Sequence, residues 1–142
     1  MTVLGLDKLK KKFGALPEEM QAAIRLASEQ GAQEMVDMAQ RLVPVDTGSL
    51  KASIAWTHGN PPGGSIGFAA GRRKAGEEVT DRISIYAGDA DAYYARWVEF
   101  GTLGRPASPF FFPAFRALKK RMRSRNTRAM NKVARKVAAG GN

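Results

Sequence analysis

The sequence lacks cysteine altogether and has one histidine, His58, among its 142 residues. The chain therefore has no disulfide, no cysteine-ligated metal site and no site built from two of its own imidazoles. No stretch approaches the roughly 18 consecutive apolar residues of a transmembrane helix. The first residues, MTVLGLDKLKKKF, lack the apolar region of a signal peptide. These absences predict a soluble protein that is made inside the cell and has no membrane partner.

Acidic residues are absent after Glu99. Residues 1–99 contain 12 Lys and Arg against 13 Asp and Glu, a net charge of −1, whereas residues 100–142 contain 11 basic residues and no acidic one. The C-terminal part therefore carries the whole net charge of +10. Such asymmetry indicates a polyanionic partner or an acidic surface on another subunit, unless the segment is a solvated basic tail.

The N-terminal part has the pattern of a long amphipathic helix. Pro17 followed by two glutamates is typical of a first helical turn, and Pro44 ends the pattern. Between them, apolar or small residues recur at steps of three or four, namely Met20, Ile24, Ala27, Gly31, Met35, Met38 and Leu42. Gly31 lies on this stripe, which predicts close approach of another element. A short helix capped by Asp7 is expected before it, through Phe13.

Three segments then alternate apolar and polar residues with the period of two that is typical of half-buried strands. They are residues 53–57, 65–68 and 82–87. The composition of HGNPPGG predicts a turn between the first two. Residues 69–79 form a charged, glycine-containing excursion, which predicts a loop or hairpin tip between the second and third strands.

Two further helices are expected after the strands. Asp91 is expected to cap a short helical turn that ends at Gly101. A second long helix is expected from Phe110, packed as far as Met122 and continuing as an arm that needs a partner. Together the elements predict an α+β fold: a long N-terminal helix, a small antiparallel sheet of three to four strands, a C-terminal helix packed on the same side, and an extended basic helical arm.

The domain organisation follows from these elements. Residues 1–118 are expected to form a single α+β domain, and residues 119–142 a basic helical arm. The charges of the arm lie all around the helix, which suits attraction to a phosphate backbone without base readout and equally suits an acidic protein ring. The predicted polyanion or neighbour-ring contacts are Arg116, Lys119, Lys120, Arg121, Arg123, Arg125, Arg128, Lys132, Arg135 and Lys136.

The segment VDTGS, residues 45–49, has the form of the aspartic-protease signature. It follows a proline-terminated helix, whereas the protease signature sits in a sheet-rich fold, so a structural turn is the favoured interpretation. The predicted turn comprises Pro44, which ends the helix, Asp46 and Thr47, which cap backbone groups, and Gly48, which adopts a positive φ. The carboxylates of the middle of the chain fit no metal-binding spacing. No catalytic, cofactor or metal site is expected.

Aromatic residues concentrate between residues 93 and 115, broken by glycines and prolines. The four phenylalanines of SPFFFPAF are too many for so small a core, which predicts that some of them bury against a neighbouring subunit. The alternative is that all four belong to the core of the single chain. The predicted interface residues are Tyr94, Trp97, Phe100, Phe110, Phe111, Phe112 and Phe115.

Three motifs occur in order after the long helix: VPVDTGSLKASI, YYARWVEFGT and SPFFFPAF. Together they resemble a family of small tail components of long-tailed bacteriophages, the neck or tail-completion proteins. The resemblance implies a non-enzymatic virion protein without a cofactor that assembles as a homo-oligomeric ring at the head–tail junction. The partners that it implies are further copies of the chain and the adjacent neck and tail proteins. DNA that passes through the ring is an additional candidate partner. The alternative function is a nucleic-acid-binding module that acts through its basic arm.

Overall fold

A computed structural model of the chain describes residues 18–69 and 83–139. Its elements confirm the expected α+β fold, although a short helix that was not expected, α3, precedes the first strand, and that strand begins at Ala55 instead of at residue 53. The elements are α2 (Glu18–Leu42), α3 (Ser49–Ala52), β1 (Ala55–His58), β2 (Ile66–Ala69), β3 (Ile83–Ala87), α4 (Ala95–Phe100) and α5 (Phe111–Ala138). The helix predicted from Asp7 and most of the excursion at residues 69–79 lie outside the described residues.

The sheet has the order β1-β3-β2, and both pairings are antiparallel. The last strand in sequence thus lies in the centre, where Ile85 is the partner of both Trp56 and Phe68. Ser84 is also completely buried, and its hydroxyl donates to the Gly59 carbonyl oxygen at 2.6 Å. The buried polar group is therefore paired, as burial in a small core requires.

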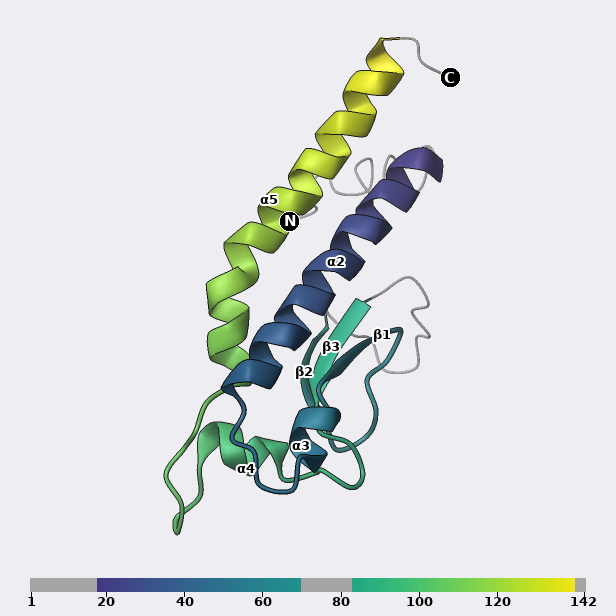
Figure 1. The fold of residues 1–142 in the computed structure, drawn as a ribbon. Helices are drawn as coiled ribbons and strands as arrows, with labels where there is room; N and C mark the ends of the chain where they lie inside the picture. The colour runs from purple at the N-terminus through teal and green to yellow at the C-terminus, as the bar shows by residue number, and fades with distance from the viewer. Residues whose placement is uncertain (1–17, 70–82, 140–142) are drawn as a thin grey trace, which may run out of the picture.

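The core lies where α2 crosses the sheet and runs beside α5 (Figure 1). Helix α2 contacts the sheet on one side and α5 on the other, so its buried face is wider than the predicted stripe. Val36 and Ala39 are buried although they lie off that stripe. Leu42, the last residue of the stripe, is exposed. The predicted close approach at Gly31 is confirmed. A Cβ there would lie 3.0 Å from the Met122 Cγ of α5.

Helix α5 continues without a break beyond Met122. The expected arm finds a partner within the chain, because Arg121 and Arg125 reach Glu34 of α2, and the Lys136 ammonium lies 3.4 Å from a Glu19 carboxylate oxygen. Whether residues 119–142 act as a unit distinct from residues 1–118 stays a prediction. None of the helices within the described ranges is long and apolar enough to cross a membrane.

Candidate functional site

The first motif forms the joint between α2 and the sheet, at the end of the molecule where α3 and α4 lie (Figure 1). Gly48 has φ +86°, which confirms the predicted positive φ. The Thr47 hydroxyl oxygen accepts a hydrogen bond from the Ser49 amide at 3.4 Å. The Ser53 hydroxyl donates to the Leu50 carbonyl oxygen at 2.6 Å and accepts from the Gly88 amide at 3.0 Å, so the motif ties α3 to the end of β3.

Asp46 is exposed and lines a hollow of about 410 Å³ together with Asp91, Tyr94 and Arg105. An aspartic protease requires two carboxylates that share a proton, and Asp46 makes no hydrogen bond to another carboxylate among the residues described. A capping role for Asp46 stays a prediction. Likewise, within residues 18–69 and 83–139 no group of three or more His, Asp or Glu is placed to hold a metal ion.

A buried carboxylate joins the second motif to the third. Glu99, at the end of α4, is only 3% exposed. Its Oε2 accepts hydrogen bonds from the amides of Phe110 and Phe111 at 2.8 and 3.0 Å, and its Oε1 accepts from the Phe112 amide at 3.0 Å. These amides belong to the first turn of α5, which has no partner for them within the helix and whose dipole favours a negative charge. Glu99 therefore fixes where α5 begins.

The aspartate cap predicted for α4 is not present, because the helix begins at Ala95 and its N-cap residue, Tyr94, makes no side-chain capping hydrogen bond. The Asp89 carboxylate, rather than that of Asp91, accepts from the amides of Asp91 and Ala92 at 2.9 and 2.8 Å. The prediction that Asp91 caps this helix was therefore wrong: α4 begins four residues later, and Asp89 closes the turn that precedes it, after Gly88 with φ +89°. At the other end of α4, Gly101 with φ +76° ends the helix as expected.

The loop between α4 and α5 folds back on itself. Thr102 and Arg105 exchange backbone hydrogen bonds at 2.9 and 3.2 Å, and the Ser108 amide donates to the Val98 carbonyl oxygen at 2.8 Å. A Cβ at Gly101 would lie 2.8 Å from the Ala107 nitrogen, so only glycine fits where the loop crosses itself. Leu103 stands at the tip of this loop, fully exposed.

The aromatic residues divide between core and surface. Phe110 and Phe111 are 0% exposed, so they have no area left for a neighbouring subunit to cover. The predicted interface can therefore include only the other five residues. Three of these, Tyr94, Phe112 and Phe115, are half-buried. The remaining two predicted interface residues are exposed, Trp97 at 51% and Phe100 at 61%.

The exposed aromatics lie along one side of α4. Tyr93, Trp97 and Phe100 are spaced i, i+4 and i+7, which places them on one face of a helix, and the rings of Tyr93 and Trp97 meet edge to face at 5.3 Å. The Phe100 ring lies 5.5 Å from that of Phe112 on α5. We call these four residues the α4 face. Tyr93, 56% exposed, was missing from the predicted interface, as was Leu103, although the spacing of Tyr93 could have revealed it.

The ten basic residues predicted to contact a partner separate into two groups. Three of them, Arg121, Arg125 and Lys136, form ion pairs with Glu34 or Glu19 of α2. The hydrogen bond from Arg125, with the positive charges of both arginines, lowers the pKa of the Glu34 carboxyl against a smaller opposing effect of burial. The other seven form no ion pair with any described carboxylate: Arg116, Lys119, Lys120, Arg123, Arg128, Lys132 and Arg135.

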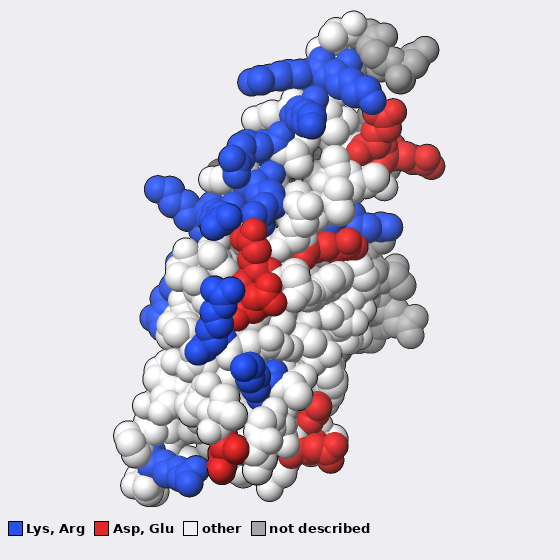
Figure 2. Space-filling model, in the orientation of Figure 1, with Lys and Arg blue, Asp and Glu red and all other residues white. Residues whose placement is uncertain are grey.

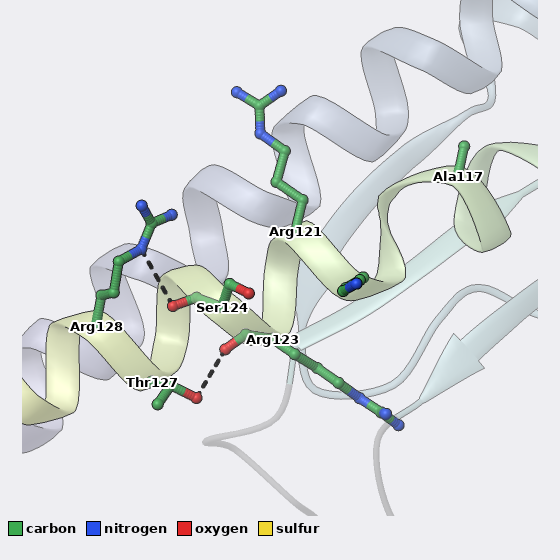
Figure 3. Close-up of a pocket in the computed structure, with 7 residues that line it drawn as sticks. Ala117, Arg121, Arg123, Ser124, Thr127 and Arg128 are labelled. Atoms are coloured by element: carbon green, nitrogen blue, oxygen red, sulfur yellow. Dashed lines mark hydrogen bonds between the residues drawn. The ribbon is translucent and has the colours of Figure 1, made fainter.

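Basic side chains follow the course of α5 over the surface visible in Figure 2, with acidic side chains on the α2 side. Between several of them lies an open hollow lined by Lys120, Arg121, Arg123, Arg128 and the small residues Ala117, Ser124 and Thr127. Arg121 and Arg128 extend from one side of the helix and Arg123 from the other, with Ser124 between them (Figure 3). The arrangement offers positive charge on both sides of a shallow, hydroxyl-lined floor.

Comparison with known proteins adds the family. The model of the family described as "Bacteriophage HK97-gp10, putative tail-component" matches residues 7–101, more than half of the chain, including the first motif and the second motif as far as Gly101. No curated protein and no solved structure gives a match. The resemblance to phage tail components that the three motifs predicted is thereby confirmed. The chain belongs to the HK97-gp10-like family of bacteriophage tail components.

Proposed function

We propose that this chain is a structural protein of the virion that acts at the head–tail junction, where it assembles with copies of itself into a ring that joins or completes the tail. The family supports a structural role in the tail. The observation that carries the self-assembly is the α4 face, because three of its aromatic side chains are more than half exposed in the single chain. No catalytic role is part of the proposal.

The α4 face has the composition of an interface centre. Aromatic residues are enriched at the centres of protein–protein contacts, and exposed apolar clusters on a folded chain mark such contacts. Leu103 projects from the neighbouring loop, and a hollow beside the face is lined by Phe100, Phe112, Phe115 and Pro109. A projecting apolar residue and an apolar hollow on the same chain suit a head-to-tail contact between copies, which closes into a ring when the rotation allows it.

The test replaces Trp97 and Phe100 together by lysine and measures mass by analytical ultracentrifugation between 1 and 100 μM, a concentration range chosen at the order of magnitude of weak self-association. Wild-type protein should form a species larger than the monomer, and the double variant should stay monomeric. The control is Leu26→Lys, which removes another exposed apolar side chain, on α2 away from the α4 face. It should assemble like the wild type.

A thermal melt of each variant separates assembly from folding. Both aromatic side chains are largely exposed, so the double variant should keep the melting temperature of the monomer. Self-association of the double variant equal to that of wild type would refute the role of the α4 face. If wild-type protein remains monomeric throughout, the proposal also requires that it assemble on purified tails of its phage, and absence of assembly there would overturn it.

A further inference from the structure

We infer that the outer face of α5 binds the phosphate backbone of double-stranded DNA, without reading its sequence. This binding surface comprises the seven cations that have no carboxylate partner among the described residues, together with Ser124 and Thr127. The inference goes beyond ring assembly and does not depend on it, since a single chain carries the whole surface.

The charge arrangement is the first step. On the side of α5 that faces α2, part of its positive charge is compensated, because Glu34 and Glu19 pair with three of its cations. Toward solvent no such compensation exists within the described part of the chain, because α5 itself contains no acidic residue. From Arg116 to Arg135 the cations extend over about 28 Å at 1.5 Å per residue, a length that matches about eight phosphates of one DNA strand.

The shape of this face favours a phosphate chain. Ala117, Ser124 and Thr127 are small, so a strand of phosphates can approach the helix backbone closely between guanidinium groups that extend to both sides (Figure 3). The Thr127 hydroxyl donates its proton to the Arg123 carbonyl oxygen at 3.0 Å, so the Ser124 hydroxyl is the donor that this floor offers to a phosphate, and the Arg128 Nε donates to the Ser124 carbonyl oxygen at 3.3 Å. The second bond holds the Arg128 guanidinium beside the hollow while its terminal NH2 groups remain available as donors.

An acidic protein is the other candidate partner, and the apolar content decides against it. Protein interfaces have an apolar centre that is depleted in lysine. Between Arg116 and Thr127, α5 exposes no large apolar side chain, because Leu118 is buried and Met122 packs against the core, and farther along the helix Met130 and Val133 are half-buried. The exposed aromatics of the described chain lie instead on the α4 face. Phosphate contacts need charge and hydroxyl groups without an apolar centre, and this is what α5 offers.

The experiment measures binding of the full chain to a fluorescently labelled 30-base-pair duplex by anisotropy at several salt concentrations. With five to seven phosphate contacts, log K should fall against log salt with a slope of about −4.5 to −6, which is a loss on the order of 10³-fold between 50 and 200 mM. Two duplexes of unrelated sequence should bind within about twofold of each other, since no base contacts are involved. A slope shallower than about −2, or strong sequence preference, would overturn the inference.

The decisive variant replaces Lys120, Arg123 and Arg128 by glutamine. Its slope should become shallower by about 2.7, and its affinity at 100 mM salt should fall at least about tenfold. The matched control removes three exposed cations elsewhere, by Arg41→Gln, Lys51→Gln and Arg105→Gln. It changes net charge equally and should alter the slope by less than about 1 unit. Equal loss in both triple variants would mean that net charge alone attracts DNA, which contradicts a defined surface.

Two further probes keep the inference separate from its competitors. Poly-glutamate of matched charge should bind more weakly than the duplex, and tighter binding of poly-glutamate would identify an acidic protein as the partner and overturn the inference. The Trp97→Lys, Phe100→Lys variant should retain the salt slope of the wild type. If that variant fails to assemble but still binds DNA with the wild-type salt slope, the proposed ring fails and this inference stands. If its salt dependence of DNA binding is lost, the claim that a single chain carries the whole binding surface is refuted.

Discussion

Replacement of Glu99 by glutamine is expected to destabilise the fold far more than its small change in shape suggests. The side chain is 3% exposed, and its two oxygens accept three amide hydrogen bonds from the first turn of α5 at 2.8 to 3.0 Å. Glutamine has one acceptor oxygen, and its NH2 group would face an amide donor. The variant therefore leaves one or two buried amides unpaired and removes the charge that suits the helix N-terminus.

The magnitude follows from these contacts. A hydrogen bond to a charged group contributes about 1.5–3 kcal/mol, against about 0.5–1.5 kcal/mol for a neutral one. Losing one such bond and weakening the others gives about 3 kcal/mol in the free energy of unfolding. A domain of this size has roughly 5–15 kcal/mol in total, so the variant should remain folded at 25 °C. Its melting temperature should fall by about 10 °C.

Urea unfolding at low protein concentration measures this loss without a contribution from self-association. Asp91→Asn is the matched control, because that carboxylate is exposed and its loss should cost less than about 0.5 kcal/mol. Hydrogen exchange localises the effect: the amides of Phe110, Phe111 and Phe112 should lose protection first. A Glu99→Gln variant within about 0.5 kcal/mol of wild type would refute the assignment of Glu99 as the cap of α5.

Other substitutions test the packing, the backbone and the ion pairs. Gly31→Leu should cost about 1–3 kcal/mol in the free energy of unfolding, because it forces α2 away from Met122. Gly31→Ala should be close to neutral, because the higher helix propensity of alanine offsets the 3.0 Å contact. Urea titrations that rank the two variants the other way would contradict this packing. Gly48→Val should cost about 1–2 kcal/mol through φ alone, since no atom lies within 4 Å of its Cβ position, and an unchanged unfolding midpoint would exclude this strain. The hydrogen bond from Arg125 lowers the pKa of Glu34 below its ordinary value of 4.5, so this ion pair stabilises the fold above that pH and the contribution is lost as the pH falls through the lowered pKa. Glu34→Gln should therefore be less stable than wild type at neutral pH and lose less stability on acidification, and parallel losses of the two proteins between pH 7 and pH 3 would refute the coupling.

The features that the sequence predicted well depend on neighbours along the chain. The end of α2 at Leu42 follows from Pro44, and the positive φ of Gly48 follows from the chemistry of a turn. Gly31 was also interpretable, because a glycine on an apolar stripe has few uses other than close packing. For Pro44 and Gly48 the physical cause acts within a few residues, so a single sequence contains it, whereas for Gly31 the sequence marks the position of the contact and not its partner, Met122.

The features that it missed depend on contacts between distant segments. The order β1-β3-β2 places the last strand in the centre, and no local pattern distinguishes that order from a simple meander. The same holds for Glu99, because the backbone amides that donate to its carboxylate lie 11 to 13 residues away across a folded loop. The four phenylalanines of the third motif look equivalent in sequence, and only the cap at Glu99 orients Phe110 and Phe111 inward.

Glu99 also relates the two surfaces that we propose to be functional. It belongs to α4, which carries Trp97 and Phe100 on its exposed side, and its carboxylate holds the first turn of α5, whose outer face carries the unpaired cations. Glu99 therefore helps to fix the direction in which the basic face points relative to the α4 face, together with the packing of α5 along α2. In an assembly built through the α4 face, that constraint gives the basic face of every copy the same orientation. This common orientation would let a closed ring of copies present its cations to a single DNA duplex, and a freely hinged arm would not achieve it.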